Sequence, residues 1–145
     1  MITRADFRIF DRFPVHWGDM DAARHVNNTV YLTWTESCRL TYLRAMGVST
    51  SFSGPEAGPI LSYVDCKYIF PMTYPDTAIV GMRTLELRAD RVIMQSAVFS
   101  EVHDRIAALS EQHLVTYDYG ALRKVPLPEQ WRRAIAKIEG WESSR

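Results

Sequence analysis

The chain has few cysteines, no long apolar run and no excess of charge of either sign. Cys38 and Cys66 are the only cysteines, and two distant thiols form neither a disulfide framework nor a metal knuckle. The 17 basic residues balance the 17 acidic ones, so no net field favours nucleic acid or an anionic membrane. No apolar stretch approaches the length that spans a bilayer. The opening residues, MITRADFRIFDRF, also lack the apolar segment of a secretory signal.

These absences favour one globular domain, residues 1–145, with a cytoplasmic location and neither a nucleic-acid nor a membrane partner. A hydrophobic share of 47% in 145 residues is enough for a sizeable core. No composition shift, internal repeat or interior linker divides the sequence.

The apolar pattern predicts one long helix among several strands. Residues 7–17 alternate, which indicates a half-buried strand with Phe7 and Trp17 on the same side as Phe13. Apolar residues recur at steps of three and four over 29–46, with few charges, which predicts a helix enclosed on most sides. The remaining expected elements are a loop at 47–59, strands at 60–70, 77–88, 91–101 and 106–119, and an amphipathic helix at 128–139.

Short links between the later strands require antiparallel neighbours, so we expect these four strands to form a meander. An antiparallel sheet beside a helix that is apolar nearly all round favours an α+β fold in which the sheet wraps the helix. The other face of such a sheet must also be covered, which predicts a dimer or a higher oligomer.

Polar side chains gather in the loop that leads into the long helix. Residues 16–29, HWGDMDAARHVNNT, contain two histidines, two aspartates and two asparagines. A helix N-terminus offers free N–H groups and a positive dipole end, which together stabilise a developing anion. An aspartate such as Asp21 could act chemically beside that end, or it could simply form the turn.

The run WGDMDAARHVNNTVY, residues 17–31, resembles the signature of the hotdog-fold acyl-CoA thioesterases related to 4-hydroxybenzoyl-CoA thioesterase. Further matches are Tyr-Ile-Phe-Pro at 68–71, Asp76 in the following turn, and Val-Pro-Leu-Pro at 125–128. The resemblance covers nearly the whole chain. It implies an antiparallel sheet of about five strands around a long central helix, with a short C-terminal helix. It also implies the thioester of an acyl-CoA, or sometimes of an acyl carrier protein, as substrate, and no metal or other cofactor. The family works as homodimers or as tetramers, which are dimers of dimers, with sites at the dimer interface.

The resemblance assigns the chemistry to two positions. Asp21 matches the family's catalytic carboxylate, and the backbone N–H at or near Asn28 matches the group that polarises the thioester carbonyl. Because a thiolate leaves readily, hydrolysis needs only a base or nucleophile on one side and anion-stabilising donors on the other. The sequence leaves open whether Asp21 activates water or attacks directly. The residues expected to bind substrate are His25, Asn27, Tyr31 and, for the CoA nucleotide, Arg88 and Arg91.

Several alternatives remain open. Asn27 could cap the helix, His25 could be an ordinary loop histidine, and Asp19 is expected to build the turn. Glu36 is the only acid on the helix, and another branch of hotdog thioesterases carries its catalytic carboxylate on this helix, but a solvated or Arg39-paired glutamate is expected here. The ligand types in 16–25 would suit a metal, yet their spacing matches no recognised metal motif. The alternative functions are a non-catalytic acyl-CoA- or lipid-binding protein and a hydratase on the same fold.

Overall fold

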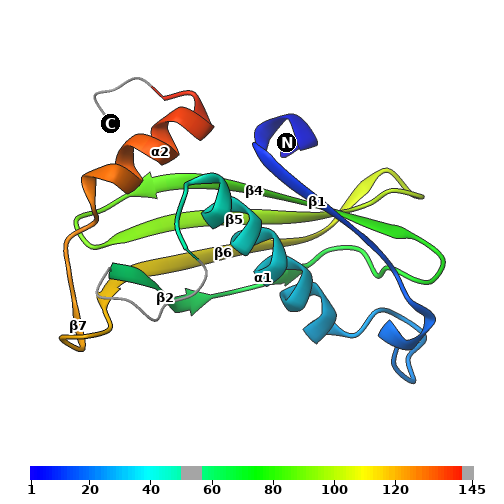
Figure 1. Cartoon of the computed structure of the whole chain (residues 1–145). Coiled ribbons are helices and arrows are strands. Elements are labelled where there is room, and N and C mark those ends of the chain that lie inside the picture. The colour runs from blue at the N-terminus through cyan, green and yellow to red at the C-terminus, as the bar shows by residue number, and fades with distance from the viewer. Residues whose placement is uncertain (50–56, 142–145) are drawn as a thin grey trace.

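The computed structural model describes residues 1–49 and 57–141, in which seven strands form one sheet and a long helix, α1 (Asn28–Ala45), crosses one face of it (Figure 1). The other elements are β1 (Ile9–Pro14), β2 (Ala57–Val64), β3 (Lys67–Tyr68), β4 (Thr77–Leu87), β5 (Arg91–Ser100), β6 (Arg105–Asp118), β7 (Arg123–Lys124) and α2 (Glu129–Glu139). Two short 3₁₀ helices lie at Arg4–Asp6 and Trp17–Asp19. This curled antiparallel sheet around a long helix, with a short C-terminal helix, is the hotdog fold that the sequence predicted.

The strand order corrects the expected meander. The order is β1-β4-β5-β6-β2, so of the four expected strands only the last three, β4, β5 and β6, are joined as consecutive hairpins. Strand β2 pairs with β6, through partners such as Ile60 and Val115, and not with β4. The physical reason is the link between β2 and β4, which is too long to impose hairpin pairing and contains β3, itself a partner of β6.

The expected strand at 60–70 is therefore two strands, and the first of them begins earlier than predicted. Ala57, Gly58 and Pro59, which the sequence suggested as loop, belong to β2, while the rest of that expected loop from 50 to 56 lies outside the described residues. The helix at 29–46, the strands at 77–88, 91–101 and 106–119 and the helix at 128–139 are confirmed to within a residue or two at each end.

The main core lies between α1 and the sheet. Tyr31, Trp34, Cys38 and Tyr42 follow one another at helical spacing and pack with sheet residues such as Val80. The opposite flank of α1 is exposed along Thr29, Thr33, Glu36 and Arg44. Apart from the end residues Asn28 and Ala45, the other positions of α1 are buried or half-buried, so the exposed strip is narrow and the helix is enclosed on most sides, as the sequence predicted.

The predicted side-chain alternation over 7–17 is wrong at both ends. Phe7 packs on the outer face of the sheet, in a second cluster with Ile79 and Phe99. It lies directly over Gly81, where an added Cβ would come within 2.8 Å of the Phe7 side chain. Trp17 follows the end of β1 in a 3₁₀ helix and is 73% exposed. None of the described helices is both long enough and apolar enough to span a membrane.

A buried carboxylate joins α2 to the sheet. The register of β4 shifts between Thr84 and Glu86, and the Thr84 N–H donates to Glu139 Oε1 at 2.8 Å. The Thr84 hydroxyl in turn donates to the Tyr42 hydroxyl at 2.9 Å. Burial raises the pKa of Glu139, which is only 6% exposed, against the opposing effect of the Thr84 hydrogen bond.

We expect Glu139 to make the free energy of unfolding fall as pH rises. Because the pKa of Glu139 is raised in the folded protein, its favourable contribution is complete below the unfolded pKa and is lost as pH rises through the folded pKa. Glu139→Gln keeps an acceptor for Thr84 and should flatten this fall in urea unfolding between pH 4 and 8. Glu139→Ala leaves the Thr84 N–H without its acceptor and should cost roughly 1–3 kcal/mol. An unchanged pH profile in Glu139→Gln would contradict this assignment.

Candidate active site

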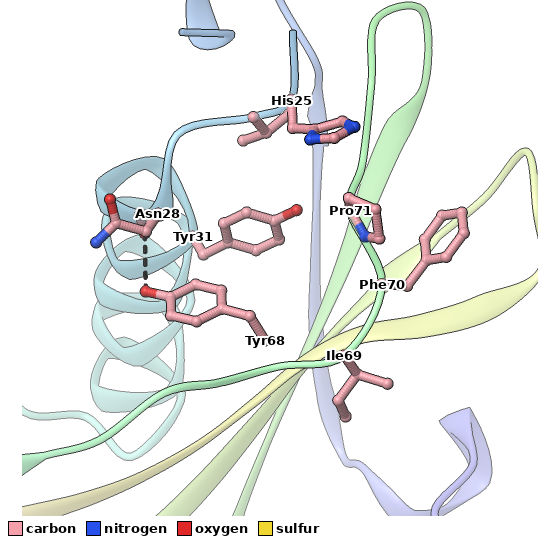
Figure 2. A pocket seen from close by; sticks show the side chains of 8 residues that line it. His25, Asn28, Tyr31, Tyr68, Ile69, Phe70 and Pro71 are labelled. Atoms are coloured by element: carbon pink, nitrogen blue, oxygen red, sulfur yellow. Dashed lines mark hydrogen bonds between the residues drawn. The ribbon is translucent and has the colours of Figure 1, made fainter. Parts of the chain in front are cut away.

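A pocket of about 250 Å³ opens beside the N-terminus of α1 (Figure 2). Its walls come from the loop before α1, the first turn of α1 and the segment that follows β3. The lining residues are His25, Val26, Asn28, Tyr31, Tyr68, Ile69, Phe70 and Pro71.

Two tyrosines form the aromatic part of the wall. The rings of Tyr31 and Tyr68 meet edge to face, with centroids 5.4 Å apart. The Tyr68 hydroxyl donates to the Asn28 carbonyl oxygen at 3.1 Å (Figure 2). The Tyr31 hydroxyl accepts from the Met72 N–H at 3.1 Å. Burial raises the pKa of Tyr31, and it raises that of Tyr68 to about 12. Neither phenol is therefore a base at neutral pH.

The loop before α1 is a closed, hydrogen-bonded turn. Asp19 Oδ2 accepts from the His16 N–H at 2.8 Å, which is the turn-building contact expected of this aspartate. Further along, the Asp21 N–H donates to the His25 carbonyl at 3.1 Å, and Arg24 takes a left-handed backbone with φ 65°. The Asn27 N–H donates to the Asp19 carbonyl at 2.9 Å and closes the loop against the start of the helix.

Asp21 lies exposed in this loop, just ahead of the helix. Its Oδ1 accepts from the Ala23 N–H at 2.8 Å, and its Oδ2 lies 3.5 Å from Asn27 Nδ2. These contacts hold the carboxylate in place and leave lone pairs free on both oxygens. Asp21 itself is not among the residues that line the pocket.

Asn28, at the helix start, lines the pocket, and its backbone N–H has no acceptor among the described residues. Asn27 is the N-cap, and its side-chain oxygen accepts from the Thr29 N–H at 2.9 Å. No described residue accepts a hydrogen bond from the Asn28 N–H. This N–H therefore combines the positive end of the α1 dipole with an unused donor, which is what an oxyanion requires.

The structure brings His25, Asn28 and Tyr31 together at the pocket and holds Asp21 and Asn27 in the adjoining loop. Arg88 and Arg91 lie elsewhere in the chain. They flank the β4–β5 hairpin, paired with Glu86 at 3.2 Å and Asp90 at 2.9 Å. Figure 1 places this hairpin at the α2 end of the sheet, opposite the end with the 17–28 loop. Their role in binding the CoA nucleotide stays a prediction.

The pocket also contains residues that the sequence did not predict as site residues: Val26, Tyr68, Ile69, Phe70 and Pro71. The last four form the Tyr-Ile-Phe-Pro match, which served as a family signal without being assigned to the site. Within residues 1–49 and 57–141, no three His, Cys, Asp or Glu side chains are placed to hold a metal ion.

Three solved structures illustrate what the chain is similar to. A thioesterase from Thermus thermophilus, in complex with coenzyme A and Zn, is 28% identical, with TM-score 0.82 over 94% of this chain and 98% of that one. A thioesterase-superfamily protein from Jannaschia sp. CCS1 is 26% identical, with TM-score 0.83 over 94% and 86%. The gentisyl-coenzyme A thioesterase BH1999, 23% identical with TM-score 0.76 over 88% and 99%, shares the fold.

No curated protein matches this chain. The model of the thioesterase-like superfamily matches residues 15–135, which include the loop, α1, the whole sheet apart from β1, and the first half of α2. The chain therefore belongs to the thioesterase-like superfamily.

Proposed function

We propose that this protein hydrolyses an acyl-CoA thioester to a free acid and CoA, at the pocket beside the N-terminus of α1. The observation that supports this most directly is that Asn28 lines the pocket with a backbone N–H that no described residue uses, and that the Asp21 carboxylate lies in the loop immediately before it. Thioester hydrolysis as the reaction class follows from the family. The coenzyme A in the Thermus thermophilus relative supports CoA as the thiol.

In the proposed reaction the thioester oxygen accepts a hydrogen bond from the Asn28 N–H, which stabilises the negative charge of the tetrahedral intermediate. Asp21 either takes a proton from the attacking water or attacks the carbonyl carbon itself to form an anhydride that water then opens. In both routes the C–S bond breaks and CoA leaves as its thiolate. His25 and Asn27 position the substrate, and Tyr31 forms the wall against the acyl group.

We also propose that a second copy of the chain completes the site. Strand β2 pairs only with β6 among the described strands, so its other edge is open. Exposed apolar side chains follow this edge toward the pocket: Leu61, Tyr63, Val64, Tyr68 and Ile69. Antiparallel pairing of two β2 edges would place the hairpin end of one copy beside the loop end of the other. Arg88 and Arg91 then remain candidates for the CoA nucleotide in a homodimer or a dimer of dimers.

The test is a CoA-release assay on short, long and aromatic acyl-CoAs, with the free thiol as readout. We expect release of CoA from at least one class, and a dimer or larger species in sedimentation. Tight binding of acyl-CoA without any free thiol would favour the non-catalytic acyl-CoA-binding alternative. Turnover of an enoyl-CoA by water addition would favour a hydratase.

A further inference from the structure

The β5–β6 turn places a cation against the pocket wall. Phe70 lines the pocket, and the guanidinium carbon of Arg105 lies 4.4 Å from the centroid of the Phe70 ring. The His103 ring meets the same ring at 4.9 Å. Figure 2 shows Phe70 directed away from Tyr31. Because Arg105 and His103 both contact the Phe70 ring, this residue of the pocket lining is the neighbour of the two basic side chains.

Hydrogen bonds hold this turn to the pocket loop. Asp76, which follows the Phe70–Pro71 segment and is 9% exposed, accepts from the Val102 N–H at 3.0 Å and from the Ser100 hydroxyl. The Ser100 oxygen in turn accepts from the His103 N–H at 3.2 Å. The basic side chains are therefore attached to the same rigid unit as the pocket wall.

The charge of Arg105 is not neutralised locally. The turn contains two acids, but Glu101 pairs with Arg12, and Asp104 pairs with Arg4 at 3.3 Å. Arg105 has no carboxylate partner in the described part of the chain, and its guanidinium lies over the ring of Phe70. In a protein of zero formal net charge, this leaves an exposed cation beside Phe70, a residue of the pocket lining.

We propose that Arg105 binds a phosphate group of CoA while the acyl end of the substrate occupies the pocket; this rests on the proposed function. Stacking on Phe70 uses the plane of the guanidinium and leaves its N–H edge available for two parallel hydrogen bonds to phosphate oxygens. The Tyr68–Phe70 segment connects the helix N-terminus to Arg105, since Tyr68 donates to the Asn28 carbonyl and the Phe70 ring contacts Arg105. His103, on the same ring, adds a neighbouring donor.

The experiment compares Arg105→Gln with wild type on two substrates that share one acyl group: the acyl-CoA and the acyl-pantetheine, which lacks the nucleotide and its phosphates. We expect kcat/KM for the acyl-CoA to fall about five- to tenfold, mostly through KM, and kcat/KM for the acyl-pantetheine to change less than about twofold. Arg133→Gln is the matched control, since Arg133 is an arginine on α2, outside the pocket lining, and it should leave both values unchanged.

The outcomes separate this inference from the proposed function. Suppose that wild type hydrolyses both substrates. If Arg105→Gln then loses activity equally on both substrates, or on neither, the role of Arg105 is overturned and the thioesterase proposal stands. If wild type releases no thiol, calorimetry with CoA itself decides. Weaker CoA binding by Arg105→Gln than by Arg133→Gln then supports the inference, while equal or undetectable CoA binding overturns it.

Discussion

Asp21→Asn is expected to lower kcat for the best acyl-CoA substrate by about 10²–10⁴-fold, the range that a positioned acid–base group contributes. Asparagine can neither take a proton from water nor attack the thioester carbon. Its side-chain oxygen can still accept from the Ala23 N–H, which now donates to Asp21 Oδ1 at 2.8 Å, so the loop should keep its shape. Steady-state CoA release measures the effect.

The same change two residues earlier is a matched control. The Asp19 carboxylate accepts from the His16 N–H within the same loop, and an asparagine oxygen can replace it there. Asp19→Asn should therefore keep kcat within about threefold, because it alters turn chemistry and not the reacting group. Full turnover by Asp21→Asn would remove Asp21 from the mechanism. An equal loss in both variants would assign the effect to the shape of the loop.

The elements that the sequence predicted well are those that local chemistry determines. Apolar side chains at steps of three and four specify α1, and Asn27 begins the helix by accepting from the Thr29 N–H. Strands β4, β5 and β6 are joined by short links that leave antiparallel pairing as the only choice. The loop before α1 was predictable for the same reason, since its polar residues are contiguous in sequence.

The sequence could not predict features that depend on contacts between distant segments. The partner of β2 is set across the sheet, by register with β6, and no local signal distinguishes β6 from β4. The outward position of Phe7 depends on the missing side chain at Gly81, more than seventy positions along the chain. In each case the order of apolar and polar residues along one strand does not identify the strand or the face of the sheet that it packs against.

The candidate site shows the same division. Asp21 and Asn28 were predicted from one continuous run of residues, whereas Tyr68 and Phe70 reach the pocket through a separate pairing, in which Tyr68 lies opposite Ala108 of β6. That pairing also accounts for Arg105, at the start of β6, lying against Phe70. The prediction for Arg88 and Arg91 rested only on their position beside a hairpin turn. Among the described residues, no contact with a distant segment links these two arginines to the pocket.

Trp34→Ala is expected to lower the free energy of unfolding by about 3–5 kcal/mol, as large aromatic truncations in cores do. Trp34 is 6% exposed and lies on the buried side of α1. Its ring stacks on Phe13 of β1, with centroids 6.4 Å apart, and meets Tyr31 edge to face at 5.5 Å. Truncation would leave a cavity between helix and sheet directly behind a pocket wall. Urea unfolding at neutral pH measures the loss.

Trp17 provides the control within the same chain, because it is the same residue type at 73% exposure and outside both hydrophobic clusters. Trp17→Ala should change the free energy of unfolding by no more than about 0.5 kcal/mol. The two variants distinguish the observed arrangement from the alternation that the sequence suggested, in which Trp17 shared the buried side of β1. A cost for Trp17→Ala comparable to that for Trp34→Ala would mean that the 17–28 loop packs into the core. The loop that holds Asp21 would then contribute to the hydrophobic core and would not be an exposed segment beside the pocket.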